Sequence, residues 1–277
     1  MLIRLGHSPD PDDAFMFWGL ASGRVDPRGF EFEHVLADIQ TLNEWALEGR
    51  LEVTALSLHA YPFVQSRYAL LPHGASMGAG YGPIVVARQP MSKEELASVR
   101  ITVPGRMTTA FLVLRLYLAP GDFESREAPF DRILDQIASG QGDAGLLIHE
   151  GQLTYAGHGL EKVVDLGEWW LLETGLPLPL GVNVARRDIG EDALRELSSV
   201  LEESIRTGLD NRGEALAYAG QFGRGLAPDL TDRFVGMYVN ELTCDYGDEG
   251  RAAVEELLRR GEAIGAFPEP VRVEFVA

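Results

Sequence analysis

Apolar and polar residues alternate along this chain with two different periods, which predicts strands and helices that follow one another from end to end. A short apolar run at 2–5 predicts a first strand, and the regular alternation at 30–36 predicts another. Residues 38–48 place their apolar side chains on one face at helical spacing, and Gly49 is a typical helix end. Strands and helices that alternate in this way are typical of the α/β fold class.

The same alternation continues through the middle of the chain, and the last third is mostly helical. Further strands are expected at 53–56, 99–103 and 143–148, and further helices at 58–65, 110–118, 130–139, 192–209, 213–222, 231–239 and 249–264. Residues 119–129 are expected to form a loop. Residues 74–83 are glycine-rich but lack the pattern of a phosphate-binding or dinucleotide-binding loop, so we interpret them as a flexible or tightly turned connector.

Two similar segments, 83–88 and 181–186, bracket the middle third, and both end in Val-Ala-Arg. If they are crossing strands, the chain leaves one lobe, builds a second and returns, and a ligand cleft lies between the lobes. Chance similarity of two short strands is the alternative. The predicted division is a first lobe of 1–88 and 187–277, an inserted second lobe of 89–186, and hinge strands near 84–88 and 182–186.

The composition is that of an ordinary globular protein, with 45% apolar and 24% charged residues among 277. No apolar run approaches the about 18–20 residues of a membrane span, so no membrane insertion is expected. Charged and turn residues arrive by Asp10, unlike in a secretory leader. The single Cys244 can form no internal disulfide, and a cytoplasmic location is therefore expected.

The formal net charge is −18, from 42 acidic and 24 basic residues. Such a surface repels phosphate backbones, so we expect no nucleic-acid partner. A small anionic ligand remains compatible with it, because a helix N-terminus can dominate the local field inside a cleft. Solubility alone is the simplest reason for the acidity. The sequence gives no prediction of the oligomeric state.

In an open α/β sheet, ligands bind beyond the carboxyl ends of the strands. That rule selects four places: the turn at 8–13, Ser57, the pair Thr108 and Thr109, and His149. Two belong to each predicted lobe, so they can face one another across one cleft. Hydroxyl and backbone N–H groups at a helix start can hold a carboxylate, but each hydroxyl can equally be a simple helix cap.

His149 follows an apolar strand at the point where polarity changes abruptly. An imidazole titrates near neutral pH, so His149 is a candidate general base, or else a histidine that only satisfies backbone groups. His7, in the first loop, is a weaker candidate for substrate contact. No metal-binding histidine spacing and no Gly-x-Ser-x-Gly motif occur, so neither a metal site nor a serine hydrolase is expected.

Trp169 and Trp170 precede the second predicted hinge segment. Their rings can stack on a flat ligand, or they can belong to the core between the lobes. We favour the core.

Several stretches together resemble the 1,4-dihydroxy-6-naphthoate synthases of the futalosine route to menaquinone. They are residues 5–17, 41–49, 103–109, 148–150, 175–181 and 185–187. The resemblance runs in order over essentially the whole chain, and no single stretch carries it alone.

The resemblance implies a two-lobe fold like that of the type II periplasmic solute-binding proteins, with two hinge strands. It implies a carbon–carbon lyase that converts cyclic dehypoxanthine futalosine, a small-molecule carboxylate, to the naphthoate without metal or organic cofactor. The family's catalytic histidine matches His149. The implied substrate contacts are Ala55, Leu56 and Ser57 in the first lobe and Thr108, Thr109 and Ala110 in the second.

One segment departs from the family, because residues 8–12 read Ser-Pro-Asp-Pro-Asp where relatives often have Ser-Pro-Cys-Pro-Asn. The contacts of this loop therefore stay open. A solute-binding protein for a small carboxylate, chorismate dehydratase and the effector domain of a regulator are the alternatives. The start of the chain argues against the first, and the lack of a DNA-binding helix pair argues against the last.

Overall fold

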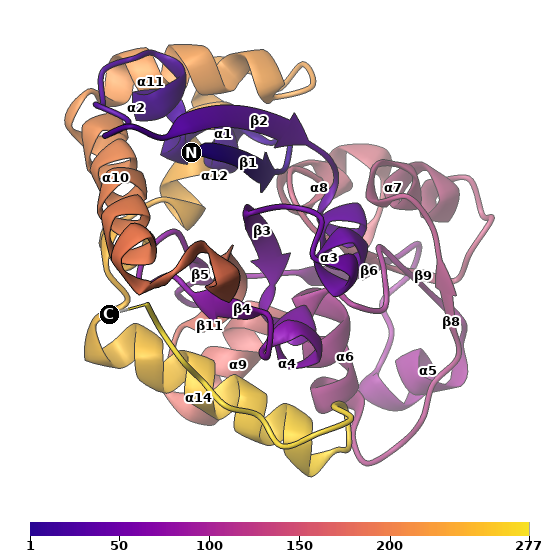
Figure 1. Ribbon diagram of the computed structural model, residues 1–277. Helices are drawn as coiled ribbons and strands as arrows, with labels where there is room; N and C mark the ends of the chain where they lie inside the picture. The colour runs from indigo at the N-terminus through magenta and orange to yellow at the C-terminus, as the bar shows by residue number, and fades with distance from the viewer. Residues whose placement is uncertain (277) are drawn as a thin grey trace.

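The computed structural model describes residues 1–276, and over this range the strands form two separate sheets (Figure 1). The first sheet has the strand order β2-β1-β3-β11-β4, and β5 pairs with β11 beside this path. Its strands are β1 (Leu2–His7), β2 (Glu31–Leu36), β3 (Val53–Ser57), β4 (Tyr68–Leu70), β5 (Ser76–Gly78) and β11 (Leu178–Arg186). Because β1 runs parallel to β2 and β3, the carboxyl ends of these strands share one edge.

The second sheet has the strand order β10-β6-β9-β7-β8. Its strands are β6 (Ile84–Ala87), β7 (Ile101–Val103), β8 (Ser125–Glu127), β9 (Ala144–Leu147) and β10 (Glu161–Asp165). Here β7 runs parallel to β8 and β9, so this sheet also gathers several carboxyl ends at one edge.

Helices cover both sheets, and those after β11 lie with the first sheet on the left of Figure 1. With the first sheet lie α1 (Pro11–Met16), α2 (Trp18–Ala21), α3 (Ile39–Glu48), α4 (Tyr61–Val64), α10 (Glu191–Asp210), α11 (Arg212–Ala219), α12 (Pro228–Tyr238), α13 (Glu241–Cys244) and α14 (Gly247–Ala263). With the second lie α5 (Lys93–Ser98), α6 (Thr109–Leu118), α7 (Phe130–Ala138), α8 (Gly151–Thr154) and α9 (Leu166–Thr174). Short 3-10 turns are η1 (Leu58–Ala60), η2 (Tyr155–His158), η3 (Arg187–Ile189) and η4 (Gly220–Phe222). Across residues 1–276, no helix has the length and apolar character needed to cross a membrane.

Helix α3 shows why the periodic segments were predictable. The Asp38 side chain accepts a hydrogen bond from the Thr41 N–H at 3.1 Å and so caps the first turn. Gly49 ends the helix in the left-handed region, with φ of 69°, where glycine carries no steric penalty. The helices predicted at 38–48, at 130–139 and after residue 192 are confirmed, with ends shifted by a few residues.

Some elements differ from the sequence prediction. The predicted loop 119–129 contains the short strand β8, and the glycine-rich connector 74–83 contains β5. The helix predicted at 58–65 is divided into η1 and α4, and β10 and α9 were not predicted. A strand of three residues is too short to show a clear period, and only its partner in the sheet defines it.

The two Val-Ala-Arg segments do not pair with each other. β6 pairs with β9 and β10 in the second sheet, whereas β11 pairs with β3, β4 and β5 in the first. The chain therefore passes from the first sheet to the second before β6, and back to the first before β11. The predicted division placed both changes after these strands, at residues 88 and 186. Similar local sequences predicted both strands, but strand partners distant in the sequence decide the sheet. A hinge role for these two segments stays a prediction.

The first crossing between the sheets is tightly packed. A Cβ atom on Gly78 would lie 1.9 Å from the Tyr81 carbonyl oxygen, and one on Gly167 would lie 2.0 Å from the same atom. The backbone at Tyr81 thus lies directly against two other backbone segments. Of the two interpretations of the glycine-rich connector, the tightly turned one is confirmed.

The largest buried apolar cluster extends across both sheets. It includes Leu56 and Val184 of the first sheet together with Val103 and Leu146 of the second, and helices α6, α9 and α14 contribute to it. Trp170 is fully buried in this cluster and donates its indole N–H to the Pro177 carbonyl at 3.1 Å. The favoured core role of Trp170 is therefore confirmed. The two lobes share one continuous core beneath the site.

Candidate functional site

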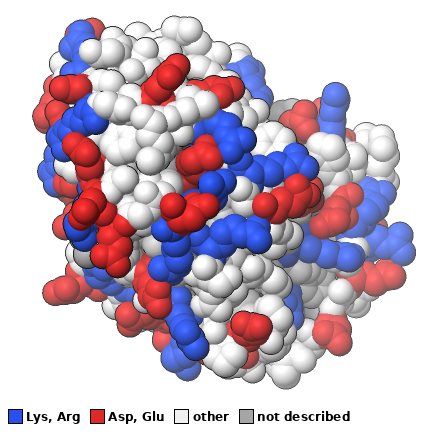
Figure 2. Space-filling model, in the orientation of Figure 1, with Lys and Arg blue, Asp and Glu red and all other residues white. Residues whose placement is uncertain are grey.

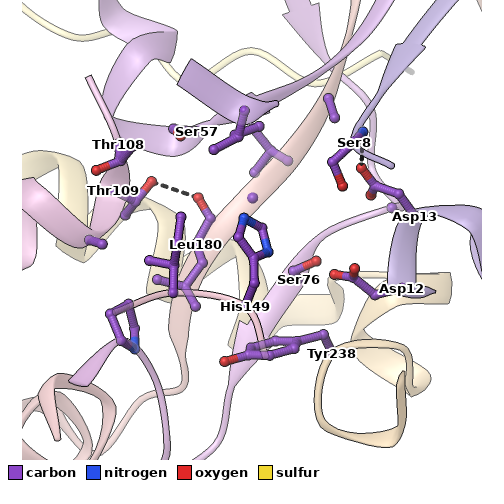
Figure 3. Close-up of a pocket in the computed structure, with 18 of the residues that line it drawn as sticks. Ser8, Asp12, Asp13, Ser57, Ser76, Thr108, Thr109, His149, Leu180 and Tyr238 are labelled. Carbon is purple, nitrogen blue, oxygen red and sulfur yellow. Dashed lines mark hydrogen bonds between the residues drawn. The ribbon is translucent and has the colours of Figure 1, made fainter. Parts of the chain in front are cut away.

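A pocket opens where the carboxyl ends of strands from both sheets meet (Figure 3). β1 and β3 lead into Ser8 and Ser57, and β7 and β9 are followed by Thr108 and His149. β11 supplies Leu180 and its neighbours as a wall. The predicted site residues that line this pocket are Ala55, Ser57, Thr108, Thr109, Ala110 and His149. The strand-end rule therefore selected residues from both lobes that do come together.

Leu56 is the exception among the predicted contacts. It does not line the pocket, and its fully buried side chain belongs to the core shared by the lobes. Successive side chains of a strand point to opposite faces, so Ala55 and Ser57 face the pocket while Leu56 faces away. The side chain of Leu56 is thus a packing residue, contrary to prediction.

At the start of α6, the two threonine hydroxyls make structural hydrogen bonds, while backbone N–H groups remain unpaired. The Thr108 hydroxyl accepts from the Phe111 N–H at 3.2 Å and donates to the Gly105 carbonyl at 2.7 Å. The Thr109 hydroxyl donates to the Leu180 carbonyl at 2.6 Å and accepts from the His59 N–H at 3.2 Å. Both hydroxyls are therefore occupied by structural bonds.

The backbone at this helix start remains available. Within residues 1–276, the N–H groups of Thr109 and Ala110 have no hydrogen-bond acceptor, and both residues line the pocket. Unpaired N–H groups at a helix N-terminus attract anions, and the helix dipole adds to this attraction. This end of the pocket can hold a carboxylate.

Asn43 was missed by the sequence analysis. It is fully buried, its amide oxygen accepts from the Ser57 N–H at 2.8 Å, and its amide N–H donates to the Ser57 hydroxyl at 3.0 Å. A second contact reaches the Met107 carbonyl at 3.4 Å, in the loop before α6. The sequence did contain a sign of this role, because Asn43 is a polar residue on the apolar face of its helix.

His149 has an unusual backbone and an unoccupied nitrogen. Its φ is 56°, in the left-handed region that non-glycine residues rarely adopt. Its Nε2 atom is buried and has no hydrogen-bond partner within residues 1–276. The ring lies in the middle of the pocket (Figure 3). It packs edge-on against Phe130, with ring centroids 4.8 Å apart. Such strain gathers at functional sites.

Asp10 and Arg224 lie on the other side of His149. Asp10 belongs to the turn at 8–13 that the sequence analysis selected, whereas Arg224 was missed. Asp10 Oδ2 lies 3.3 Å from His149 Nδ1, and Asp10 Oδ1 lies 2.6 Å from the Arg224 guanidinium. Arg224 also pairs with Glu150 at 2.9 Å and lies over the ring of Phe130. Burial alone would raise the pKa of Asp10, but the nearby His149 and Arg224 outweigh it and lower that pKa.

Two more carboxyl groups lie at the opposite end of the pocket from α6 (Figure 3). Asp13 accepts the Ser8 N–H at 2.6 Å, and burial raises its pKa to about 6. Asp12 is buried as well, and burial together with the charges of Asp13 and Asp10 raises its pKa well above the usual range. Its Oδ1 atom has no partner within residues 1–276. The pocket therefore has a donor-rich end and an acidic end.

His7 does not line the pocket. It is buried in the first lobe, where its Nε2 lies 3.0 Å from His34 Nδ1. Burial lowers the pKa of both rings to about 4. Within residues 1–276, no cluster of three or more His, Cys, Asp or Glu side chains is arranged to hold a metal ion.

Two lobes with a pocket between them define the class of the periplasmic-binding-protein-like folds. The alkanesulfonate-binding protein SsuA from Xanthomonas axonopodis pv. citri matches with a TM-score of 0.73 at 13% identity, covering 98% of this chain and 96% of that one. A crystal structure of a protein from Archaeoglobus fulgidus matches with a TM-score of 0.90 at 46% identity, covering 95% of this chain and 98% of that one.

The chain belongs to the menaquinone biosynthesis family, whose model matches residues 3–263. A relative from Thermus thermophilus named 1,4-dihydroxy-6-naphtoate synthase is 46% identical, with 97% of each chain covered. One from Streptomyces coelicolor with the same name is 38% identical, with 96% of this chain and 95% of the relative covered.

Proposed function

We propose that this protein is a lyase that converts cyclic dehypoxanthine futalosine to 1,4-dihydroxy-6-naphthoate, with His149 as the general base. The observation that carries the proposal is the imidazole of His149. Its Nε2 is buried and unpartnered in the pocket, and the free N–H groups of Thr109 and Ala110 line the same pocket. Family membership and the names of the two relatives support the reaction.

In this mechanism, the substrate carboxylate binds at the start of α6. The backbone N–H groups of Thr109 and Ala110 donate to it, and the Ser57 hydroxyl, held by Asn43, adds a donor from the other lobe. Bound there, the substrate presents its acidic C–H bond to His149. Nε2 takes the proton, and the electron pair left on carbon breaks a carbon–carbon bond, so the bicycle becomes aromatic and the rest of the substrate leaves as a second product. The proton on Nε2 then passes to the departing fragment or to water.

The test is a comparison of His149→Asn with the wild type, with naphthoate release followed by mass spectrometry. Asn is the substitution of choice because it tolerates the left-handed backbone at this position. We expect turnover to fall by about 10²-fold or more, as for the loss of a general base. His158→Asn is the matched control, because His158 is exposed and outside the pocket, and it should leave turnover unchanged.

Each outcome separates the alternatives. Near-normal turnover of His149→Asn removes this residue from the role of base. A wild-type protein that binds the compound but returns it unchanged is a solute-binding protein. A wild-type protein that does not convert cyclic dehypoxanthine futalosine but dehydrates chorismate is a chorismate dehydratase.

A further inference from the structure

We propose that Asp10 positions His149 by accepting its Nδ1 proton, so that Nε2 faces the pocket as the bare, basic nitrogen. This inference rests on the proposed function only for its catalytic consequence. The orientation of the ring and the location of its proton are properties of the protein alone.

The argument begins with the proton of a neutral imidazole, which occupies either Nδ1 or Nε2. Nδ1 lies 3.3 Å from Oδ2 of Asp10, which is an ion-pair distance without hydrogen-bond geometry. Oδ2 has no hydrogen-bond partner within residues 1–276, and Nε2 has none either. An ionised carboxylate only accepts hydrogen bonds, so it selects the tautomer with the proton on Nδ1. Nε2 is then unprotonated and ready to accept.

Arg224 keeps Asp10 in the form that this role requires. Its guanidinium lies 2.6 Å from Oδ1, and Asp10 is only 1% exposed. Burial opposes the ionisation of Asp10, and the positive charge of Arg224 favours it. The charge of Asp10 in turn raises the pKa of Asp12 and of Asp13. Glu150 pairs with the far side of the guanidinium and holds it at the second lobe.

Phe130 packs against both His149 and Arg224 and so limits how each can be oriented. Its ring packs edge-on against His149, and the guanidinium of Arg224 lies over it at 4.8 Å from the ring centroid. The imidazole is thus held between an aromatic ring and a carboxylate. A 180° turn of the ring would keep the contact with Phe130 but would take Nδ1 away from Asp10.

Asp10→Asn gives a sharp test, because a guanidinium can only donate hydrogen bonds. The Asn oxygen must turn to Arg224, which leaves the amide N–H₂ facing His149 Nδ1. That nitrogen must then accept, so the proton moves to Nε2. We expect kcat to fall by about 10²–10³-fold with little change in KM, because a proton on Nε2 blocks the base without altering the carboxylate site.

The proton is located directly by ¹⁵N NMR of the imidazole in protein without substrate, with His149 assigned by loss of its signals in His149→Asn. The wild type should show Nδ1–H, and Asp10→Asn should show Nε2–H. In the double variant Asp10→Asn, Arg224→Met the amide is free to turn back, so the Nδ1–H tautomer should return. Glu150→Gln is the control, because it changes the partner of Arg224 but not that of His149, and its tautomer should match the wild type.

An Nε2–H tautomer in the wild type, or the same Nδ1–H tautomer in folded Asp10→Asn, overturns the inference. If Asp10→Asn does not fold, the wild-type tautomer still decides. If the tautomers change as expected but the wild type releases no naphthoate, the positioning role stands and the proposed reaction fails. If the wild type is active and folded Asp10→Asn keeps its kcat, the reaction stands and the positioning role fails.

Discussion

At the scale of single residues, the pocket depends on polar side chains that hold other polar groups in place. Asn43 is the clearest case, because it satisfies both the N–H and the hydroxyl of Ser57 and also reaches the loop before α6. A buried amide with several partners costs more to remove than a single exposed hydrogen bond.

We expect Asn43→Ala to lower the free energy of unfolding by about 2–3 kcal/mol, because the buried N–H of Ser57 loses its acceptor. It should also raise KM for the proposed substrate. A double-mutant cycle with Ser57→Ala, measured by urea unfolding and by steady-state kinetics, isolates the pair. The two losses should be less than additive by about 1 kcal/mol. Strictly additive losses would show that the two side chains act independently.

The sequence predicted the site residues that stand directly at strand ends. Ser57 ends β3, Thr109 begins the helix that follows β7, and His149 comes two residues after β9, so a local rule finds them. Asp10 lies in the turn at 8–13 that the same rule selected, but Arg224 belongs to the site only because the folded chain brings it to Asp10. No local pattern identifies such a partner.

At the scale of elements, the segment that crosses between the two sheets leaves no room for a side chain at two glycine positions. The backbone of Tyr81 lies against Gly78 and Gly167, and Gly167 also begins the second lobe's helix α9 with its neighbour Leu166. Any side chain at these glycines would meet backbone atoms, which cannot move aside as a flexible side chain can.

We expect Gly167→Ala to lower the free energy of unfolding by about 3 kcal/mol or more, because its Cβ would lie 2.0 Å from the Tyr81 carbonyl oxygen. Gly157→Ala is the matched control, since its Cβ would have no atom within 4 Å, and its effect should stay within about 0.5 kcal/mol. Urea unfolding of the two variants measures both values. Equal stabilities would mean that the crossing segment relaxes freely.

The fold was predictable from sequence where an element is long and periodic. Helices such as α3 and α10 show a clear apolar face and cap or end signals, and the strands of the first parallel unit stand between turn residues. β5 and β8 have three residues each and exist only through pairing with β11 and β7. Pairing also decided the sheet to which each Val-Ala-Arg segment belongs, and no local pattern in the sequence could do so.

At the scale of the whole molecule, the chain carries many charged residues of both signs. On the face drawn in Figure 2, acidic and basic side chains lie among one another and are not gathered in separate areas. On this face, the acidic excess behind the net charge of −18 is not gathered into one patch. The absence of a nucleic-acid partner stays a prediction that a binding assay at low salt can check.

Buried histidines should make the molecule sensitive to acid. Burial lowers the pKa of His7, His34, His59 and His73 to about 4, whereas in the unfolded chain a histidine titrates near 6.5. The unfolded state therefore binds more protons between these values. The stability contribution is complete above about pH 6.5 and is lost as the pH falls toward 4.

His73 provides a test of this effect away from the pocket, since its Nε2 contacts the Ser198 hydroxyl at 2.9 Å. In His73→Gln the group that titrates is gone, so the variant should lose less stability on acidification. From pH 7 to pH 5 the stability difference between wild type and variant should change by about 2 kcal/mol in favour of the variant. The raised pKa values of Asp12 and Asp13 act with the opposite sign in both proteins and cancel. Parallel stability curves in urea would contradict the prediction.

The charged contacts around His149 join the beginning, middle and late parts of the chain, through Asp10, His149 and Arg224. A nascent chain still short of residue 224 has no means to complete this set, whatever its first lobe has already folded. A fragment that ends before residue 224 therefore lacks the contact between Arg224 and Asp10, and under the proposed mechanism it would lack the ionised partner of His149.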